Sequence, residues 1–372
     1  MMIDSTVIST KKRQTPTWRN PSSDVAGGFA DLKHNDSRFA KEGKLRRAQP
    51  RAVRQAAEAV KERIELLLWS DVPHWQQHGS ELIHTGYRGA CGSIKGCLQS
   101  WTYLHNETVN IYSHIIGAII FLLLVPAWLI ATAVPPRFAV ATPLDMLVLG
   151  TYLAGVGICF ILSVTFHTLM SHSPRIYHLG MRLDFQGILL LMWSSTVPLV
   201  YYSFPCQATV MQTTYLVTIT LLAGACSAAT LLPRFSGPHL GHYRAVLFGS
   251  FGLGSFVVPI AHGILLYGLK EQSRRIGLGW IMVTGLCNGV GVVVYAVKVS
   301  SCGGVGGYPL ELRSDADDWA MKQFPEKWFP KTFDIWGASH QCMHVMVVCA
   351  ALAFARAMVA AFDFRHEHGV QC

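Results

Sequence analysis

Long apolar runs dominate this sequence, and each continues for about 20 residues with almost no charge. Hydrophobic residues make up 51% of the chain and charged residues only 14%, so few charges are available to interrupt the runs. A helix needs a run of this length and polarity to cross a hydrocarbon core about 30 Å thick. The sequence therefore predicts an all-α polytopic membrane protein and excludes an ordinary soluble domain.

We expect a bundle of seven transmembrane helices. The predicted spans are residues 109–131, 143–169, 183–202, 208–232, 244–269, 276–299 and 335–362. Residues 106–362 would then form the membrane domain. Residues 1–50 would be a disordered basic tail, 51–105 a cytosolic juxtamembrane helical segment, and 363–372 a short C-terminal tail.

Much of the net charge of +9 lies in the first part of the chain, in "KKRQTPTWR" and "KEGKLRRAQPRAVR". Such clusters can bind nucleic acid. Ahead of several spans they are more typical of a cytosolic tail that touches anionic lipid, and we expect no nucleic-acid partner. The stretch "RAVRQAAEAVKERIELLLW", residues 51–69, has the period of an amphipathic helix.

Lys and Arg in the short loops predict the orientation, because cytoplasmic loops carry an excess of these residues. We expect the N-terminus in the cytosol and the C-terminus outside. The loop between spans 5 and 6 fits this topology least well, because it carries basic residues on the predicted outer side. No signal peptide is visible, and the pattern fits the plasma membrane or an endomembrane. The loops predicted to be cytosolic hold Arg175, Arg182, Arg234, Arg244, Lys298, Arg313, Lys322, Lys327 and Lys331, whereas Arg137, Lys270, Arg274, Arg275 and Arg365 lie opposite.

Five polar side chains from three spans are predicted at one depth, near the cytosolic ends. Titratable groups inside a span are costly and are usually functional. The motif "SVTFH" places Ser163 and His167 on one helical face, and Asp184 begins the next span. His340 and His344 lie one turn apart at the start of the last span.

Three histidines with a fourth position open to water are a common composition for catalytic zinc. His167, His340 and His344 would bind the metal, Asp184 would act as the base, and Ser163 would orient water or hydrogen-bond a substrate carbonyl. An isolated pair of histidines four residues apart is weak evidence, because most such pairs bind nothing or only hydrogen-bond neighbouring helices. The shared depth of His167 and Asp184 strengthens the case for a metal, and both interpretations remain open on the residues alone.

The run "HNETVNIYSH" opens the first span and places Glu107, Asn110 and His114 at one-turn spacings. We interpret them as a hydrogen-bonded packing cluster that could support the site, with His114 as a fourth ligand the less favoured alternative. Cys91 and Cys97 match no paired motif and are expected to be ordinary thiols rather than metal ligands or a disulfide.

These motifs resemble the progesterone and adipoQ receptor family, which includes adiponectin receptors, fungal members linked to zinc and lipid homeostasis, and hemolysin III-like proteins. The matching stretches are "ELIHTGYR", "LHNETVNIYSHIIG", "SVTFHTLMSHS", "LDFQGI" and "FPEKWFPKTFDIWGASHQCMH". The resemblance implies seven helices, a cytosolic N-terminus, and zinc held by His167, His340 and His344 with Asp184 near its water. It also implies ceramidase-type hydrolysis. The insertion "SCGGVGGYPLELRSDADDWAMKQ" departs from the family pattern.

Two functions remain open. One is a zinc-dependent intramembrane hydrolase of a lipid amide, with ceramide as the leading substrate. The other is a receptor, with an extracellular ligand, or a metal-homeostasis regulator, in which zinc is a structural clamp. A closed site would need a fourth protein ligand, so the three candidate histidines favour the open site.

Overall fold

The computed structural model describes residues 66–77, 82–126, 140–204, 208–232, 241–299, 325, 329 and 331–367. Several predictions lie outside these residues. They concern the tail at 1–50, most of the juxtamembrane helix, the end of the first span at 127–131, the insertion at 301–323, and residues 368–372. The described residues form helices, and their one pair of bridged extended residues is Leu67 with Tyr87.

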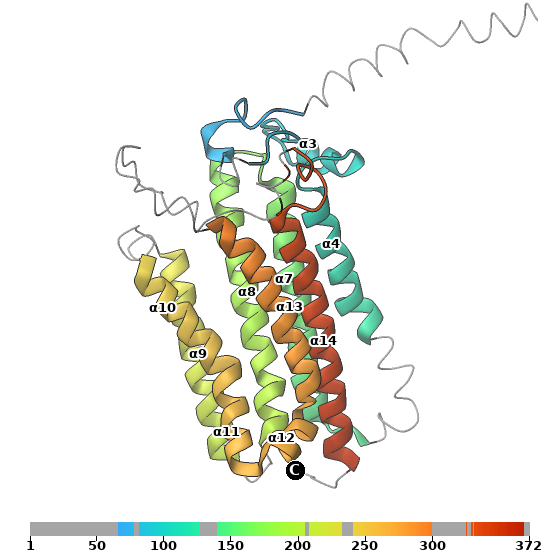
Figure 1. Cartoon of the computed structure of the whole chain (residues 1–372), viewed down its shortest axis with the longest axis vertical. Coiled ribbons are helices and arrows are strands. Elements are labelled where there is room, and N and C mark those ends of the chain that lie inside the picture. Colours follow the sequence, from blue (N-terminus) through green and yellow to red (C-terminus); the bar gives the residue numbers. More distant parts are fainter. Residues whose placement is uncertain are drawn as a thin grey trace, which may run out of the picture. The chain divides into compact units, whose positions relative to one another are not determined.

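The helices follow one another along the whole membrane domain (Figure 1). Short turns precede them at η1 (His74–Gln76) and η2 (Ser100–Thr102), and η3 (Ile120–Leu124) and η6 (Leu253–Val257) are π-helical turns inside longer helices. The α-helices are α3 (Ile94–Gln99), α4 (Thr108–Ile119), α7 (Pro143–Leu169), α8 (Pro174–Ser203), α9 (Thr209–Leu231), α10 (Gly241–Gly252), α11 (Val258–Tyr267), α12 (Leu269–Ile276), α13 (Leu278–Val299) and α14 (Ser339–Glu367).

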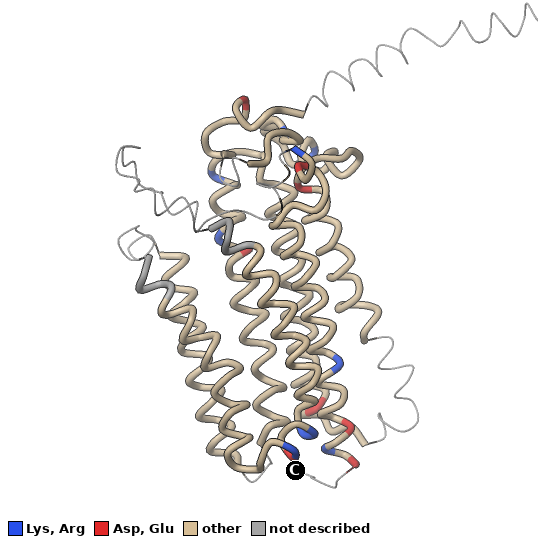
Figure 2. Tube along the Cα trace, in the orientation of Figure 1, with Lys and Arg blue, Asp and Glu red and all other residues tan. Residues whose placement is uncertain are grey.

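Five of the described helices are long and apolar enough to cross a membrane, and the number is six if the bent pair of α12 and α13 counts as one span. They are Pro143–Leu169, Pro174–Ser203, Thr209–Leu231, Val246–Tyr267 and Ser339–Glu367. The first predicted span is a shorter apolar helix, Thr108–Leu124, within the described residues. Charged residues gather toward the two ends of the described helices, and most of the middle portions of these helices carry none (Figure 2). The predicted all-α membrane bundle is confirmed.

The predicted sixth span, residues 276–299, corresponds to α13, but the loop expected before it contains a further short helix, α12. The chain breaks into α12 and α13, which are bent by 74° relative to each other. Gly268 and Gly277 adopt φ angles of 81° and 61° at the two ends of α12, a conformation that glycine reaches without steric cost. The polar sequence "LKEQSRRI" between them suits a helix at the membrane surface better than one in hydrocarbon.

Three other boundaries also differ from prediction. The helix of the third span begins nine residues early, at Pro174 rather than at residue 183, because Pro at the first helical position is preorganised for a helix. The last helix begins at Ser339 rather than at residue 335, after Gly337 turns the chain with a φ of 81°. Residues 66–69 are not helical, because Leu67 pairs with Tyr87 through two backbone hydrogen bonds of 2.8 and 3.2 Å.

Close helix packing positions the ends of α7 and α14. Helix α7 packs along α8, and α13 packs along α14, whereas α9 and α11 lie beside α8 and α10 packs on α9 (Figure 1). Gly187 permits the approach of α8 to α7, since a Cβ atom there would lie 3.2 Å from the Cα of Cys159. A capping box between Thr142 and Asp145 begins α7 at its other end.

Candidate metal centre

Three histidines from two helices converge at one end of the bundle. His167 lies in the last turn of α7, and His340 and His344 lie in the first turns of α14. One ligand nitrogen from each ring lies within 4.8 Å of the others, and the Nε2 atoms of His340 and His344 are 3.1 Å apart. His167 and His344 are each only 2% exposed, whereas His340 is half-buried, so two of the three rings are shielded from solvent. The structure therefore brings together the three histidines predicted from the sequence.

Glu107 orients His167 from the residue just before α4. Its Oε2 atom lies 2.7 Å from Nδ1 of His167, and the Asn110 side chain donates to the same oxygen at 2.6 Å. Burial opposes the charge on Glu107, but the hydrogen bond and charge of His167, the nearby His340 and the Asn110 amide hold the pKa of Glu107 well below its usual value. A carboxylate on Nδ1 leaves Nε2 of His167 available, and this buried nitrogen has no hydrogen-bond partner among the described residues.

The turn before α4 holds Glu107 in place. Thr108 Oγ1 accepts a hydrogen bond from the backbone N–H of His105 at 2.9 Å, and Nδ1 of His105 accepts one from the N–H of Glu107 at 3.1 Å. Burial and the nearby Arg88 cation lower the pKa of His105 to about 3, so its ring is neutral and can accept this bond. The backbone of "HNET" thereby fixes the carboxylate that faces His167.

The start of α14 is anchored by Gln341, which sequence reasoning did not single out. Its Oε1 atom accepts hydrogen bonds from the backbone N–H groups of Gly337 and Ala338, at 2.7 and 3.2 Å. Its Nε2 group donates to the carbonyl oxygens of Asn106 and Ile335, at 2.9 Å each. Gln341 thus joins the turn before α14 to the turn before α4, and it lies between His340 and His344 in the sequence.

Arg88 terminates α7 at the histidine end. Its guanidinium donates to the carbonyl oxygens of His167 and Thr168 and to the hydroxyl of Ser100. These carbonyls belong to the last turn of α7, where the helix leaves acceptors without internal partners. The side chain is 6% exposed, so this is a buried cap directly behind a candidate ligand.

Ser163 and Asp184 adjoin the histidines, as predicted. Ser163 lies one turn before His167 on α7, is 2% exposed, and its hydroxyl makes no hydrogen bond with the described residues. Asp184 faces Ser163 from α8 and interacts electrostatically with His167. These two oxygen-bearing side chains therefore lie at the edge of the group, outside the three ligand atoms themselves.

His114 packs against the site from α4. Its ring centroid is 4.1 Å from that of His344 and 4.7 Å from that of Phe160, and neither of its ring nitrogens has a hydrogen-bond partner among the described residues. The group of mutually close ligand atoms comprises His167, His340 and His344 and does not include His114. We expected this face of α4 to pack into the bundle near the site, and the burial of Asn110 and His114 agrees with that expectation.

The prediction that Cys91 and Cys97 are ordinary thiols is wrong in the structure. They are joined as a disulfide, with Cα atoms 6.2 Å apart. Gly92 adopts a φ of 61° and reverses the chain just before α3 begins, which returns Cys97 to Cys91. The backbone N–H of Cys91 donates to the carbonyl of Ser171 at 2.9 Å, so this turn lies against the chain that follows α7.

The donor set fits a transition-metal ion. Imidazole nitrogens suit zinc, copper, iron and nickel, and three histidines with one open position are a known catalytic zinc set. Tetrahedral ligands about 2.0–2.1 Å from zinc lie about 3.3 Å from one another. The 3.1 Å separation between Nε2 of His340 and Nε2 of His344 is close to this value, and the buried Nε2 of His167 lacks any other partner.

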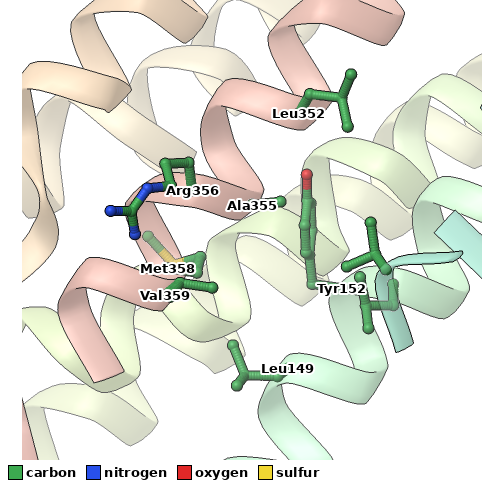
Figure 3. Close-up of a pocket in the computed structure, with 9 residues that line it drawn as sticks. Leu149, Tyr152, Leu352, Ala355, Arg356, Met358 and Val359 are labelled. Atoms are coloured by element: carbon green, nitrogen blue, oxygen red, sulfur yellow. The ribbon is translucent and has the colours of Figure 1, made fainter. Parts of the chain in front are cut away.

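A separate apolar hollow of about 170 Å³ lies nearer the other end of α14 (Figure 3). It is lined by Leu149 and Tyr152 of α7 and by Leu352, Ala355 and Arg356 of α14, among others, and none of its lining residues is one of the three histidines. Tyr152 also donates to the carbonyl of Ala351 at 2.7 Å, which joins α7 to α14 beside this hollow.

Comparison with known proteins matches residues 102–305 and 320–355 to the haemolysin-III-related family. These residues include all three histidines and cover more than half of the chain. The chain belongs to this family. The membership agrees with the resemblance that the sequence motifs indicated.

Three relatives that align with more than four-fifths of this chain describe the family further. The chain is 34% identical over 319 residues to the ADIPOR-like receptor IZH2 of Saccharomyces cerevisiae, covering 85% of this chain and 91% of that protein. It is 33% identical over 302 residues to the adiponectin receptor protein of Drosophila melanogaster, covering 81% of this chain and 58% of that protein. It is 28% identical over 382 residues to heptahelical transmembrane protein 4 of Arabidopsis thaliana, covering 83% and 91%. The chain is therefore an adiponectin-receptor-like, multi-pass membrane protein.

Proposed function

We propose that the protein is a zinc-dependent hydrolase of a lipid amide, with ceramide as the leading substrate class, and that it acts in lipid and zinc homeostasis. The observation that carries the proposal is the group of three histidine nitrogens within 4.8 Å of one another, from the buried His167 and His344 and the half-buried His340. The carboxylate of Glu107 holds one of these rings in the orientation that a metal ligand needs.

A zinc ion bound by His167, His340 and His344 would supply Lewis acidity and lower the pKa of a coordinated water to about 7. The protein's own residues would do the rest. Asp184 would accept the proton released during attack on the amide carbonyl, because it faces the group from α8. Ser163 would donate its hydroxyl to the carbonyl oxygen. Glu107 would keep Nδ1 of His167 occupied.

The position of the site supports a substrate from the bilayer. The three histidines lie in the end turns of α7 and α14, and both helices are long and apolar enough to span a membrane. A lipid amide could reach this depth with its polar head near the surface and its chain among the helices. On the predicted orientation, this end of the bundle faces the cytosol.

A receptor or metal-homeostasis regulator with a structural zinc is the alternative. The ligands come from α7 and α14, so a bound metal would cross-link the second and last predicted spans directly. His114 packs against His344, neither of its ring nitrogens has a hydrogen-bond partner among the described residues, and the ring offers a nearby fourth donor if it turns. The adiponectin receptor names of the relatives favour this alternative, in which an extracellular ligand would be the partner.

Ceramide turnover distinguishes the two functions. Purified wild-type protein with measured zinc content should release fatty acid from ceramide. Asp184→Asn should keep its zinc and lose release by about 10²–10⁴-fold, the usual contribution of a general base, whereas His344→Ala should lose both. A zinc-loaded wild-type protein that releases no fatty acid from ceramide or from related lipid amides would favour the clamp.

A further inference from the structure

A second hollow, of about 520 Å³, lies between α9 and the helix formed by η6 and α11. Its volume is in the range of about 300–1,000 Å³ that is typical of small-molecule sites. The hollow lies toward the start of α9 and along α11. In the bundle this is the end away from the histidines at the start of α14 (Figure 1). None of the residues that line it belongs to the candidate metal centre.

A tyrosine–histidine pair forms the polar wall of this hollow. The hydroxyl of Tyr215 on α9 lies 2.8 Å from Nδ1 of His262 on α11. Phe204 stacks on Tyr215, with ring centroids 5.3 Å apart and an interplanar angle of 9°, and it also contacts the His262 ring at 5.7 Å. Nε2 of His262 has no hydrogen-bond partner among the described residues. A histidine inside a span is costly and is by default a functional residue.

A π-helical turn opens the opposite wall. Turns of this kind insert one extra residue into a helix and occur frequently at functional sites. Gly254 of η6 lines the hollow, and a Cβ atom at this position would lie 3.3 Å from Cδ1 of Ile219. The absence of a side chain at Gly254 therefore keeps the space between η6 and α9 open.

The lining selects a neutral ligand from the bilayer. None of the described residues that line the hollow carries a formal charge when His262 is neutral, and Thr214, Thr218, Tyr215 and His262 are its polar members. Neighbouring apolar side chains face outward, with Val210 82% exposed and Leu265 84% exposed, as expected for contact with lipid chains. A charged head group would have no counter-ion in this wall.

We propose that this hollow binds a neutral, hydroxyl-bearing membrane amphiphile through the Tyr215–His262 pair. When Tyr215 donates to Nδ1, the neutral ring carries its proton on Nε2 and donates to the ligand oxygen. When Nδ1 donates to Tyr215, Nε2 accepts from the ligand. A hydroxyl group can serve both tautomers, whereas an ether oxygen can serve only the first. The apolar chain of the ligand would lie along α9 and α11.

Photolabelling of the purified full-length protein in detergent tests this proposal. The probe is hexadecanol that carries a diazirine on its chain, and the competitors are hexadecanol and its methyl ether. We expect labelled peptides from α9 and α11, competition by the alcohol at several-fold lower concentration than by the ether, and roughly fivefold less labelling in His262→Leu, the loss of one hydrogen bond.

Two glycine variants form a matched control for the shape of the hollow. Gly254→Leu should abolish labelling by filling the space. Gly249→Leu, on α10, should not, because a Cβ atom at Gly249 would meet nothing within 4 Å. All variants are compared after their thermal midpoints have been measured. Equal labelling of a folded His262→Leu variant, equal competition by alcohol and ether, or undiminished labelling of a folded Gly254→Leu variant would each overturn the proposal.

Discussion

Removing the carboxylate of Glu107 should weaken metal binding without removing any metal ligand. The Glu107–His167 bond is 2.7 Å long, and the two side chains are 15% and 2% exposed. A hydrogen bond to a charged group contributes about 1.5–3 kcal/mol. Since about 1.4 kcal/mol corresponds to a tenfold change, zinc affinity should fall about 10- to 100-fold. Outer-shell carboxylates on metal-bound histidines have effects of the same size.

Two substitutions separate the effect of the Glu107 charge on zinc affinity from the effect of its hydrogen bond to His167. Glu107→Gln keeps an oxygen that can accept from Nδ1 of His167 and should lose about tenfold in affinity. Glu107→Ala loses both and should approach a 100-fold loss. Affinity is measured by competition with a chromophoric zinc chelator on purified protein. Glu271→Gln is the matched control, because Glu271 is 39% exposed and pairs with Arg275 on α12, far from α4 in the sequence. Wild-type affinity in a folded Glu107→Ala variant would refute the reasoning.

Three further substitutions test the packing and anchoring of the site. Gly155→Ala should destabilise the protein by about 1–3 kcal/mol, because the added Cβ would overlap the side chain of Ser194. Gly150→Ala, with nothing within 4 Å, should be neutral or stabilising. Thermal unfolding in detergent measures both, and equal midpoints would contradict the close α7–α8 contact. Arg88→Met should cost on the order of 3 kcal/mol, because it leaves two buried carbonyls at the end of α7 without their donor; an unchanged thermal midpoint would contradict this role. Gln341→Ala should lower zinc affinity while the bundle stays folded, because the first turn of α14 loses its ties to the turn before α4; unchanged affinity in the chelator assay would count against it.

The helices were predictable because their cause is local. The apolar runs that became α7, α9 and α14 are continuous in the sequence, and the lengths of these helices follow from the membrane thickness. The depth of His167, His340 and His344 follows from span direction alone, and the prediction that they lie together is confirmed by their geometry. The roles of Ser163 and Asp184 in catalysis stay predictions.

The features that were missed depend on contacts between distant segments. Gln341 donates to Asn106, which is 235 positions away, and Thr85 donates to Asp334, 249 positions away, at 2.7 Å. No periodicity within either segment indicates these partners. The pairing of Leu67 with Tyr87 is of the same kind, because it replaces a locally helical pattern with an extended one. Helix α12 did leave a local signal, because two glycines flank its polar octapeptide. This octapeptide lies in the loop between spans 5 and 6, which fits the predicted topology least well.

Zinc-edge X-ray absorption on the purified protein tests the central claim most directly, because it reports the ligands of the metal itself. The proposed function predicts one zinc per chain, bound by three imidazole nitrogens and one oxygen at about 2.0–2.1 Å. It also predicts that this imidazole signature is lost in the His340→Ala, His344→Ala double variant. A protein that binds no zinc under saturating conditions, or a double variant whose spectrum is unchanged, would contradict the account.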